Sequence, residues 1–254
     1  MLEFFQTIFY QPILNLLIFL YNVIPGSDLA VAIILLTIII KIILHPLSKQ
    51  SIKGQKSLQD LQPKIEEIKQ QYGDDRERMG KEMMQLYKDH KVNPLSSCLP
   101  LLLQLPFLIA VFHVFKSGFG EKTLALVYPF ITTPQAVNSI IELSSPNWYL
   151  AIMAGAAQFL QTKMMMADKP QMQTPGAKDE SMSAIMSKQM MYFMPLITVF
   201  IGLTLPGGVA LYILVITLLT ALQQKLMFRK DNKNNDDNKG EEKAEKKVVE
   251  GKVS

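Results

Sequence analysis

Apolar residues along this chain of 254 residues gather in long blocks instead of alternating with polar ones. A bilayer core about 30 Å thick is crossed by roughly 20 mostly apolar helical residues. Four blocks reach or approach that length and a fifth is shorter but strongly apolar; in that order they cover 29–48, 94–116, 148–166, 209–228 and 190–205. The pattern predicts an all-α integral membrane protein with five transmembrane helices.

The N-terminal segment, 1–28, is apolar but interrupted. Tyr10 and Tyr21 suit the depth of lipid headgroups, and four residues break the apolar run: Gln6, Gln11, Pro12 and Asn15. We predict an amphipathic helix that lies in the external membrane interface. A sixth span is the alternative. A cleaved signal peptide is disfavoured, because the segment has neither a basic start nor a small-residue cleavage site.

The segment 49–93 is the main predicted element outside the membrane. Its apolar residues recur in alternating steps of three and four, in two runs separated by the turn signal Gly73-Asp74-Asp75. This spacing predicts two amphipathic helices in an antiparallel coiled-coil hairpin, with Pro63 at a kink or helix restart. A solvated connector is the alternative, but a connector needs only a few residues and loops this long usually bind something.

Basic residues predict the orientation of the chain. No Lys or Arg precedes Lys41, whereas Lys49, Lys53 and Lys56 crowd the far end of the first block, which is therefore cytoplasmic. The N-terminus is then external. The remaining connections alternate: the hairpin 49–93 is cytoplasmic, the loop 117–147 external, the loop 167–189 cytoplasmic, the turn 206–208 external and the tail 229–254 cytoplasmic.

The composition of the tail and the low number of cysteines and histidines limit the possible functions. The tail 229–254 is poor in apolar residues and rich in Lys, Glu, Asp and Asn, which predicts disorder. Its balanced charge favours a solubilising tail over an anchor for ribosomal RNA or anionic lipid.

A single cysteine, Cys98, and three histidines exclude a disulfide framework and a Cys-based metal cluster. We expect no metal, no cofactor, no DNA partner and no small-molecule substrate, and the chain is not predicted to be an enzyme.

One ammonium, Lys41, lies within the first apolar block. An ammonium in a span costs about 2.5–3.5 kcal/mol, and a straight helix would place it about 12 Å from Lys49. The predicted spans hold no Asp or Glu to pair with it, and their other prominent polar residues are Thr37, Gln104, Gln158, Gln161, Gln189, Thr217, Gln223 and Gln224. We predict that Lys41 faces a water-filled cavity lined by such groups. Snorkelling to the headgroups is the alternative.

Three kinds of protein could use a positively charged cavity open to the cytoplasm. A transporter usually shows internal repeats or paired interrupted helices, and a channel needs a ring of ligands. Neither signal is present in the sequence. A cavity that transiently holds segments of other proteins fits better, since a fixed positive charge attracts acidic residues. A scaffold that assembles other subunits also stays open.

The order of several short motifs resembles the YidC/Oxa/Alb family of membrane protein insertases, most closely its bacterial members without a large external domain. The resemblance covers about residues 4–228. The motifs are Thr37-Ile-Ile-Ile-Lys41, His45-Pro-Leu47, Leu61-Gln-Pro-Lys-Ile65, Glu82-Met-Met-Gln-Leu-Tyr87, Val92-Asn-Pro-Leu95, Cys98-Leu-Pro-Leu-Leu-Leu-Gln-Leu-Pro106, Phe193-Met-Pro195, Leu205-Pro-Gly-Gly208, Leu211-Tyr212 and Gln223-Gln224.

The resemblance implies five transmembrane helices around a hydrophilic groove that opens to the cytosol and to lipid. It implies that the groove's basic residue attracts the hydrophilic tail of a nascent membrane protein, whose apolar segment then passes into the bilayer, alone or with the Sec translocon and ribosomes. The implied groove residues are Lys41, Thr37, Gln104, Gln158, Gln161, Gln189 and Tyr212. Those implied for substrate capture by the hairpin are Leu61, Pro63, Ile65, Met83, Leu86 and Tyr87. The implied location is the bacterial plasma membrane.

Two positions depart from the family pattern. The family usually has Arg where Lys41 stands, and Lys lacks the bidentate guanidinium fork. Relatives also often carry an aromatic residue at the position of Ile213. A small-solute transporter or channel subunit is the alternative function.

Overall fold

A computed structural model describes residues 2–73, 75–93, 96, 99–134, 137–166 and 182–250, with the backbone path alone at 2, 100–101, 182–190 and 229–250. The described residues form helices and contain no β-strand, only one isolated bridge between Asp28 and Asn138. The elements are α1 Leu2–Phe5, the π-helical turn η1 Gln6–Tyr10, α2 Gln11–Val23, α3 Leu29–Ile43, α4 His45–Asp60, α5 Gln62–Tyr72, α6 Arg76–Asp89, α7 Leu99–Ser117, α8 Glu121–Leu124, α9 Trp148–Met166, α10 Met182–Thr204 and α11 Gly207–Glu250.

Length and composition single out the helices able to cross a membrane. Glu3–Val23 and Gly207–Phe228 qualify among the described residues, and α3 and α4 qualify together as one pair bent by 68°. Leu102–Ser117 and Met191–Thr204 are apolar but shorter. The predicted all-helical membrane fold is confirmed, whereas the arrangement of five spans around a groove stays a prediction.

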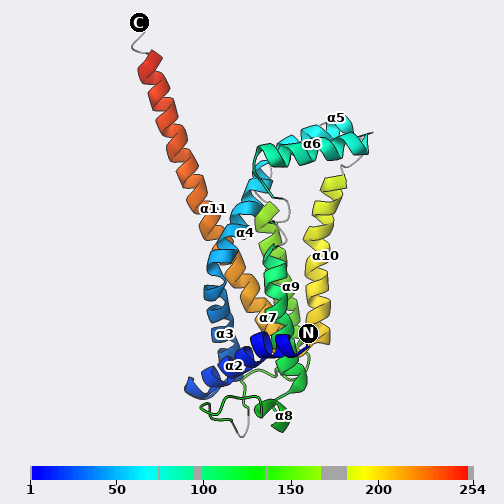
Figure 1. The fold of residues 1–254 in the computed structure, drawn as a ribbon, viewed down its shortest axis with the longest axis vertical. Helices are drawn as coiled ribbons and strands as arrows, with labels where there is room; N and C mark the ends of the chain where they lie inside the picture. Colours follow the sequence, from blue (N-terminus) through cyan, green and yellow to red (C-terminus); the bar gives the residue numbers. More distant parts are fainter. Residues whose placement is uncertain are drawn as a thin grey trace.

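Five long helices, α3, α7, α9, α10 and α11, run roughly along the long axis of the molecule (Figure 1). Helix α9 packs against α10 and α11, and α11 packs against α3. The N-terminal helices α1 and α2 lie across the lower end of this bundle in Figure 1, while the pair α5 and α6 lies at the opposite end. Whether this N-terminal segment lies in the interface or spans the membrane stays a prediction, since Glu3–Val23 is also long and apolar enough to cross.

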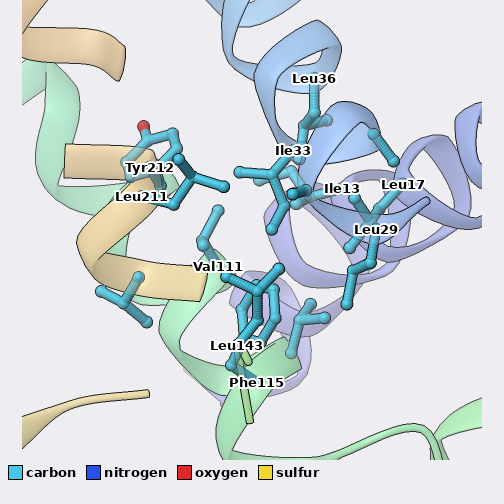
Figure 2. Close-up of a cluster of buried hydrophobic side chains, with 14 of the residues drawn as sticks. Ile13, Leu17, Leu29, Ile33, Leu36, Val111, Phe115, Leu143, Leu211 and Tyr212 are labelled. Atoms are coloured by element: carbon cyan, nitrogen blue, oxygen red, sulfur yellow. The ribbon is translucent and has the colours of Figure 1, made fainter. Parts of the chain in front are cut away.

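The core joins α2, α3, α7 and α11. Figure 2 shows Leu17 of α2, Ile33 of α3 and Val111 of α7 around one cluster of buried side chains. Leu14 of α2 and Ile33 are fully buried. One face of α2 therefore packs against the bundle, and this packing fixes the position of the helix.

Two glycines let α9 and α10 approach closely. A Cβ atom added to Gly155 of α9 would overlap the Val199 side chain, and one added to Gly202 of α10 would lie 2.9 Å from the Cα atom of Ala151. Small residues at such positions allow helix backbones to pack together in membranes.

The first apolar block is not one straight helix. We expected a span over 29–48, but α3 ends at Ile43, and α4 begins at His45 in a direction that differs by 68°. Pro46 lies in the first turn of α4 and has no N–H, so the carbonyl of Ile42 cannot form the usual helical bond. Leu44 N–H instead contacts the carbonyls of both Ile40 and Ile42. The bend follows from this local loss of hydrogen bonding.

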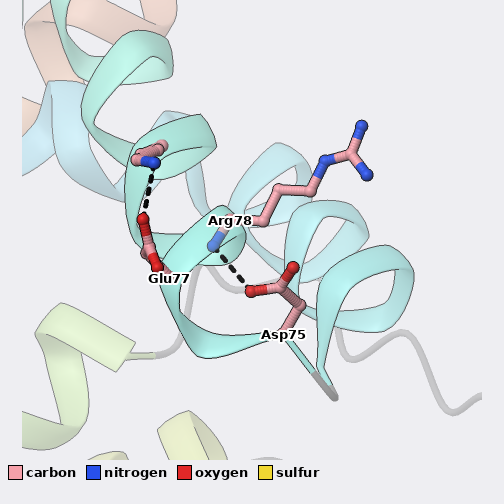
Figure 3. Close-up of polar contacts among 4 residues, drawn as sticks. Asp75, Glu77 and Arg78 are labelled. Atoms are coloured by element: carbon pink, nitrogen blue, oxygen red, sulfur yellow. Dashed lines mark hydrogen bonds and ion pairs between the residues drawn. The ribbon is translucent and has the colours of Figure 1, made fainter.

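Helices α5 and α6 pack against each other as a hairpin. Helix α4 ends at Asp60, and α5 restarts with Pro63 in its first turn, where a missing N–H costs nothing. Asp75 caps α6 by accepting the backbone N–H of Arg78 at 2.9 Å, and Lys81 pairs with Glu77 at 2.6 Å (Figure 3). The paired part of the predicted hairpin is thus shorter than 49–93, because α4 continues from the membrane as a separate arm (Figure 1).

Helix α11 continues beyond the predicted fifth span to Glu250. We predicted a disordered tail over 229–254, whereas the described part of that segment is helical and leaves the bundle (Figure 1). Lys, Glu and Ala are strong helix formers, and a helix that is already started extends without a new nucleation cost. The amino-acid composition of the tail does not reveal that its helix continues from α11 without a new nucleation cost.

The loop between α7 and α9 is fastened to α2 by polar side chains. Asn15 is buried; its Oδ1 accepts the N–H of Tyr128 at 2.6 Å, and its Nδ2 donates to the carbonyl of Leu126 at 3.2 Å. Gln11 Nε2 donates to the same carbonyl at 3.1 Å. The polar residues that interrupt the apolar run of α2 therefore bind the backbone of the loop between α7 and α9.

Replacing Asn15 by leucine is expected to loosen this loop. The change would leave the partly buried N–H of Tyr128 without its acceptor, and the loss of such a hydrogen bond costs about 1 kcal/mol. Limited chymotrypsin digestion of the reconstituted protein should cut near Tyr128 several-fold faster than in the wild type. The control is Asn22→Leu, because Asn22 is exposed and makes one bond to the carbonyl of Thr132. Equal cleavage of both variants would contradict the prediction.

Candidate functional site

Lys41 lies in the last turn of α3, two residues before the helix ends. Its half-buried side chain reaches α11, where Nζ donates a hydrogen bond to Thr220 Oγ1 at 2.9 Å. The Thr220 hydroxyl donates in turn to the carbonyl of Ile216 at 2.6 Å. Thr220 thus presents a lone pair to the ammonium because its own proton is used within α11.

The bend explains how an ammonium is tolerated here. Lys41 sits beside the carbonyl end of α3, where the partial negative charge of the helix dipole favours a cation. The sequence placed Lys41 about 12 Å from Lys49 along a straight helix. Because the chain bends after Ile43, that distance no longer measures how deep Lys41 lies in the membrane. Among the described residues, no carboxylate lies within ion-pair distance of Lys41. The ammonium therefore retains capacity for an anionic partner.

A series of polar contacts runs along α11. Its residues Tyr212, Thr220 and Gln224 each hydrogen-bond a side chain of another helix. Gln104 Nε2 of α7 donates to the hydroxyl of the fully buried Tyr212. Gln161 Nε2 of α9 donates to Gln224 Oε1 at 3.4 Å. Helix α11 thereby collects polar side chains from α3, α7 and α9.

A second contact joins α4 and α11 one turn beyond Lys41. The side-chain amide Nε2 of Gln223 lies 3.2 Å from His45 Nδ1, which accepts the hydrogen bond in the neutral tautomer that carries its proton on Nε2. Gln223 is 8% exposed. Its Oε1 atom is buried and has no hydrogen-bond partner among the described residues. An unpaired buried carbonyl oxygen is uncommon in folded proteins.

The other predicted groove residues have different surroundings. Thr37 is fully buried and donates to the carbonyl of Ile33 in its own helix, so its hydroxyl is already satisfied. Gln158 is half-buried one turn before Gln161 on α9. Gln189 belongs to α10, but its side chain lies outside the described residues. The structure brings Lys41, Gln104, Gln161 and Tyr212 to α11 and leaves Thr37 inside the packing of α3.

The predicted capture residues divide into two groups. Leu61 and Ile65 are buried near the start of α5, close to Pro63. Met83, Leu86 and Tyr87 of α6 are half-buried, and α6 has no fully buried residue. Partial burial raises the pKa of the Tyr87 phenol, so it stays protonated at neutral pH. The face of α6 toward α5 is therefore only partly covered.

Sequence reasoning missed Thr220 and His45 as site residues, and it named Gln223 only among the polar groups expected to line the cavity. Gln223 and His45 belong to motifs noted above, and Thr220 lies four residues before Gln224, about one turn along α11. That spacing is the signal that could have found Thr220. The contact of His45 with α11 depends on the bend after Ile43, which the apolar pattern does not indicate.

The chemistry of this arrangement is that of recognition. The contacts around α11 include one ammonium, two hydroxyls and four amide side chains, which together can bind a carboxylate and peptide groups. Within the described part of the chain, no group of three His, Cys, Asp or Glu residues is placed to hold a metal ion.

Comparisons with known proteins agree with this picture. The family model of the 60Kd inner membrane protein matches residues 19–235. A relative from Fusobacterium nucleatum, named membrane protein insertase YidC, is 35% identical over 204 residues, which are 80% of this chain and 88% of that protein. Proteins of the same name from Mannheimia succiniciproducens and Haemophilus influenzae are 39% and 37% identical over 215 and 219 residues.

These alignments cover 84% and 86% of the chain but 36% of each of the last two relatives, so the chain spans little more than a third of their length. Together with the long apolar helices, the match over most of the sequence makes this chain a bacterial inner-membrane protein and a member of the 60Kd inner membrane protein family, to which it is related through proteins named membrane protein insertase YidC.

Proposed function

We propose that this protein is a membrane protein insertase that works without catalysing a chemical reaction. It captures the hydrophilic tail of a nascent membrane protein beside Lys41 and releases the apolar segment into the bilayer. The driving force is the partition of that segment into lipid, with the membrane potential acting on charged tails.

The observation that carries the proposal is the ammonium of Lys41. It lies within an apolar helix, is held by the neutral hydroxyl of Thr220, and has no carboxylate partner among the described residues. A charge in that position usually marks a functional site. The names of the relatives point to the same activity.

The proposal includes a groove and an orientation. The groove opens to the cytoplasm and is lined by Lys41, Gln104, Gln158, Gln161, Gln189 and Tyr212, with Thr37 behind Lys41. The N-terminus is external and the C-terminus cytoplasmic. The hairpin α5 and α6 contacts the substrate before insertion, because α6 exposes Met84 and leaves Met83 and Leu86 partly uncovered. Nascent chains delivered by ribosomes, alone or with the Sec translocon, are the proposed partners.

The test is insertion into vesicles that contain the purified protein. A single-span substrate with an acidic external tail is synthesised in their presence, and the tail is assayed for protection from added protease. The expected result is protection that depends on the protein, with site-directed crosslinks from Lys41 and Tyr212 to the substrate. Solute flux without such crosslinks would support a transporter instead, and altered complex sizes with unchanged insertion would support a scaffold.

The single tryptophan provides a check on membrane position. Trp148 begins α9, is 54% exposed and stacks on Tyr149. Aromatic side chains at a span end favour the interface. Its fluorescence should be quenched more by lipids brominated near the glycerol end of the acyl chain than near the terminal methyl group. Strongest quenching near the methyl end would contradict the placement, and Trp148→Tyr supplies the background signal.

A further inference from the structure

We propose that Gln223 is a substrate-binding residue that accepts a hydrogen bond from a backbone amide of the inserted polypeptide, next to the acidic residue that pairs with Lys41. This inference rests on the proposed insertase function and adds a second binding group to it. The ligand is an acidic polypeptide segment recognised at two points, by its carboxylate and by a neighbouring N–H group.

The unpaired oxygen of Gln223 is the first support. Its Oε1 atom is buried without a partner among the described residues, while Nε2 contacts His45. Turning the amide by 180° would exchange the two atoms and leave the NH2 group in the unpartnered position instead. In either orientation, one end of a 92% buried amide has hydrogen-bonding capacity that the described residues do not use. Such a group costs free energy in the free protein, and a ligand that satisfies it recovers that cost.

The second support is the position of Gln223 relative to Lys41. Thr220, which holds Lys41, lies three residues before Gln223, so their Cβ atoms are about 5–6 Å apart on one face of α11. An extended polypeptide advances about 3.3 Å per residue. A carboxylate at Lys41 would therefore bring a backbone N–H one or two residues away toward Gln223.

The third support is the nature of the contacts between α11 and the bent pair α3 and α4. Polar or charged contacts cross this boundary at Lys41 with Thr220, at His45 with Gln223, and at Lys56 over the Phe228 ring at 6.0 Å. Beyond Phe228, α11 and α4 lead away from the bundle in different directions (Figure 1). A polypeptide that enters there can replace each of these polar contacts with one of its own, next to the apolar core that α3 and α11 share.

The experiment measures peptide binding and does not require insertion. The full-length protein in lipid nanodiscs is titrated into a fluorescent soluble peptide with one Asp among Ser and Gly residues. In a matched set of peptides, the amides around the Asp are N-methylated one at a time, which removes the N–H donor. One of the amides within two residues of the Asp is expected to lose about tenfold in affinity for the wild type when methylated.

The decisive comparison is with Gln223→Met, which removes the acceptor and keeps the side-chain volume. This variant is expected to bind the unmethylated peptide about tenfold more weakly than the wild type and to show no further loss on methylation. Gln223→Leu should behave in the same way. The matched control is Gln224→Met, since the amide of Gln224 already contacts Gln161 and Met165, and it should retain the loss on methylation.

An equal methylation loss in the wild type and in Gln223→Met would overturn the inference. So would the absence of any methylation loss in the wild type, or no binding of the unmethylated peptide. The methylated peptides are also tested against the wild-type protein, so the inference can be overturned even if the Gln223 variants misfold. Failure of the proposed function would appear separately, as a lack of protein-dependent insertion in vesicles.

Discussion

Replacing Lys41 by alanine is expected to reduce insertion of a single-span substrate with an acidic external tail about tenfold. The substitution removes the ammonium that Thr220 holds at the end of α3. A hydrogen bond to a charged group contributes about 1.5–3 kcal/mol, and 1.4 kcal/mol corresponds to a factor of ten. The measurement is the fraction of substrate tail protected from protease in vesicles that contain equal amounts of each variant.

Two controls separate charge recognition from general damage. Lys41→Arg keeps the positive charge and adds a bidentate donor, so insertion should be retained or improved. A substrate whose acidic residues are replaced by their amides should be inserted equally by the wild type and by Lys41→Ala. If the wild type and the alanine variant insert the acidic substrate equally well, the role of the charge is refuted.

Replacing Gly202 by valine is expected to destabilise the bundle strongly. Even the first added carbon would lie 2.8 Å from Ala151 Cβ and 2.9 Å from Ala151 Cα. Because Cα belongs to the backbone, α9 and α10 must move apart, and overpacking of this kind costs about 1–3 kcal/mol. Thermal unfolding in detergent, followed by circular dichroism, should show a midpoint lower by about 5 °C or more.

The neighbouring glycines supply matched comparisons. Gly155→Ala meets the flexible side chain of Val199, so Val199→Ala should rescue it in a double-mutant cycle. No side-chain truncation removes the backbone contact at Gly202. Gly80→Ala in α6 has no atom within 4 Å of the new Cβ and should be neutral or slightly stabilising. Equal midpoints for Gly202→Val and Gly80→Ala would contradict the close packing of α9 and α10.

Much of the fold follows from the period and length of the apolar blocks. The predicted block 148–166 coincides with α9, and 94–116 and 190–205 overlap α7 and α10. This success has a simple cause: in a membrane the backbone must satisfy its own hydrogen bonds, so a long apolar block has little choice but to be a helix. The described part of the tail shows the limit, since its helix continues from α11 and not from local composition.

Much less of the candidate site could be predicted. The sequence identified Lys41 as a candidate site residue because it is a charge within an apolar block, and it identified Gln104 and Gln161 because they are amides in apolar surroundings. Their partners were not predictable, because Lys41 and Thr220 are 179 residues apart in sequence and meet only through the packing of α3 against α11. For the same reason, Thr37 looked available from its helical face but is enclosed by neighbouring helices.

The residue pattern alone establishes an all-helical membrane chain, the family to which it belongs and a positive charge within its first apolar block, because each depends on local composition and order. Tertiary structure decides the rest. The bend after Ile43 places Lys41 at a helix end, and packing against α11 supplies Thr220 and sets His45 beside Gln223. Likewise, the polar residues of α2 become partners of the loop between α7 and α9 only when that loop folds back onto the helix. Contacts between distant segments depend on how helices pack, and an apolar period specifies which face is buried without naming its neighbour.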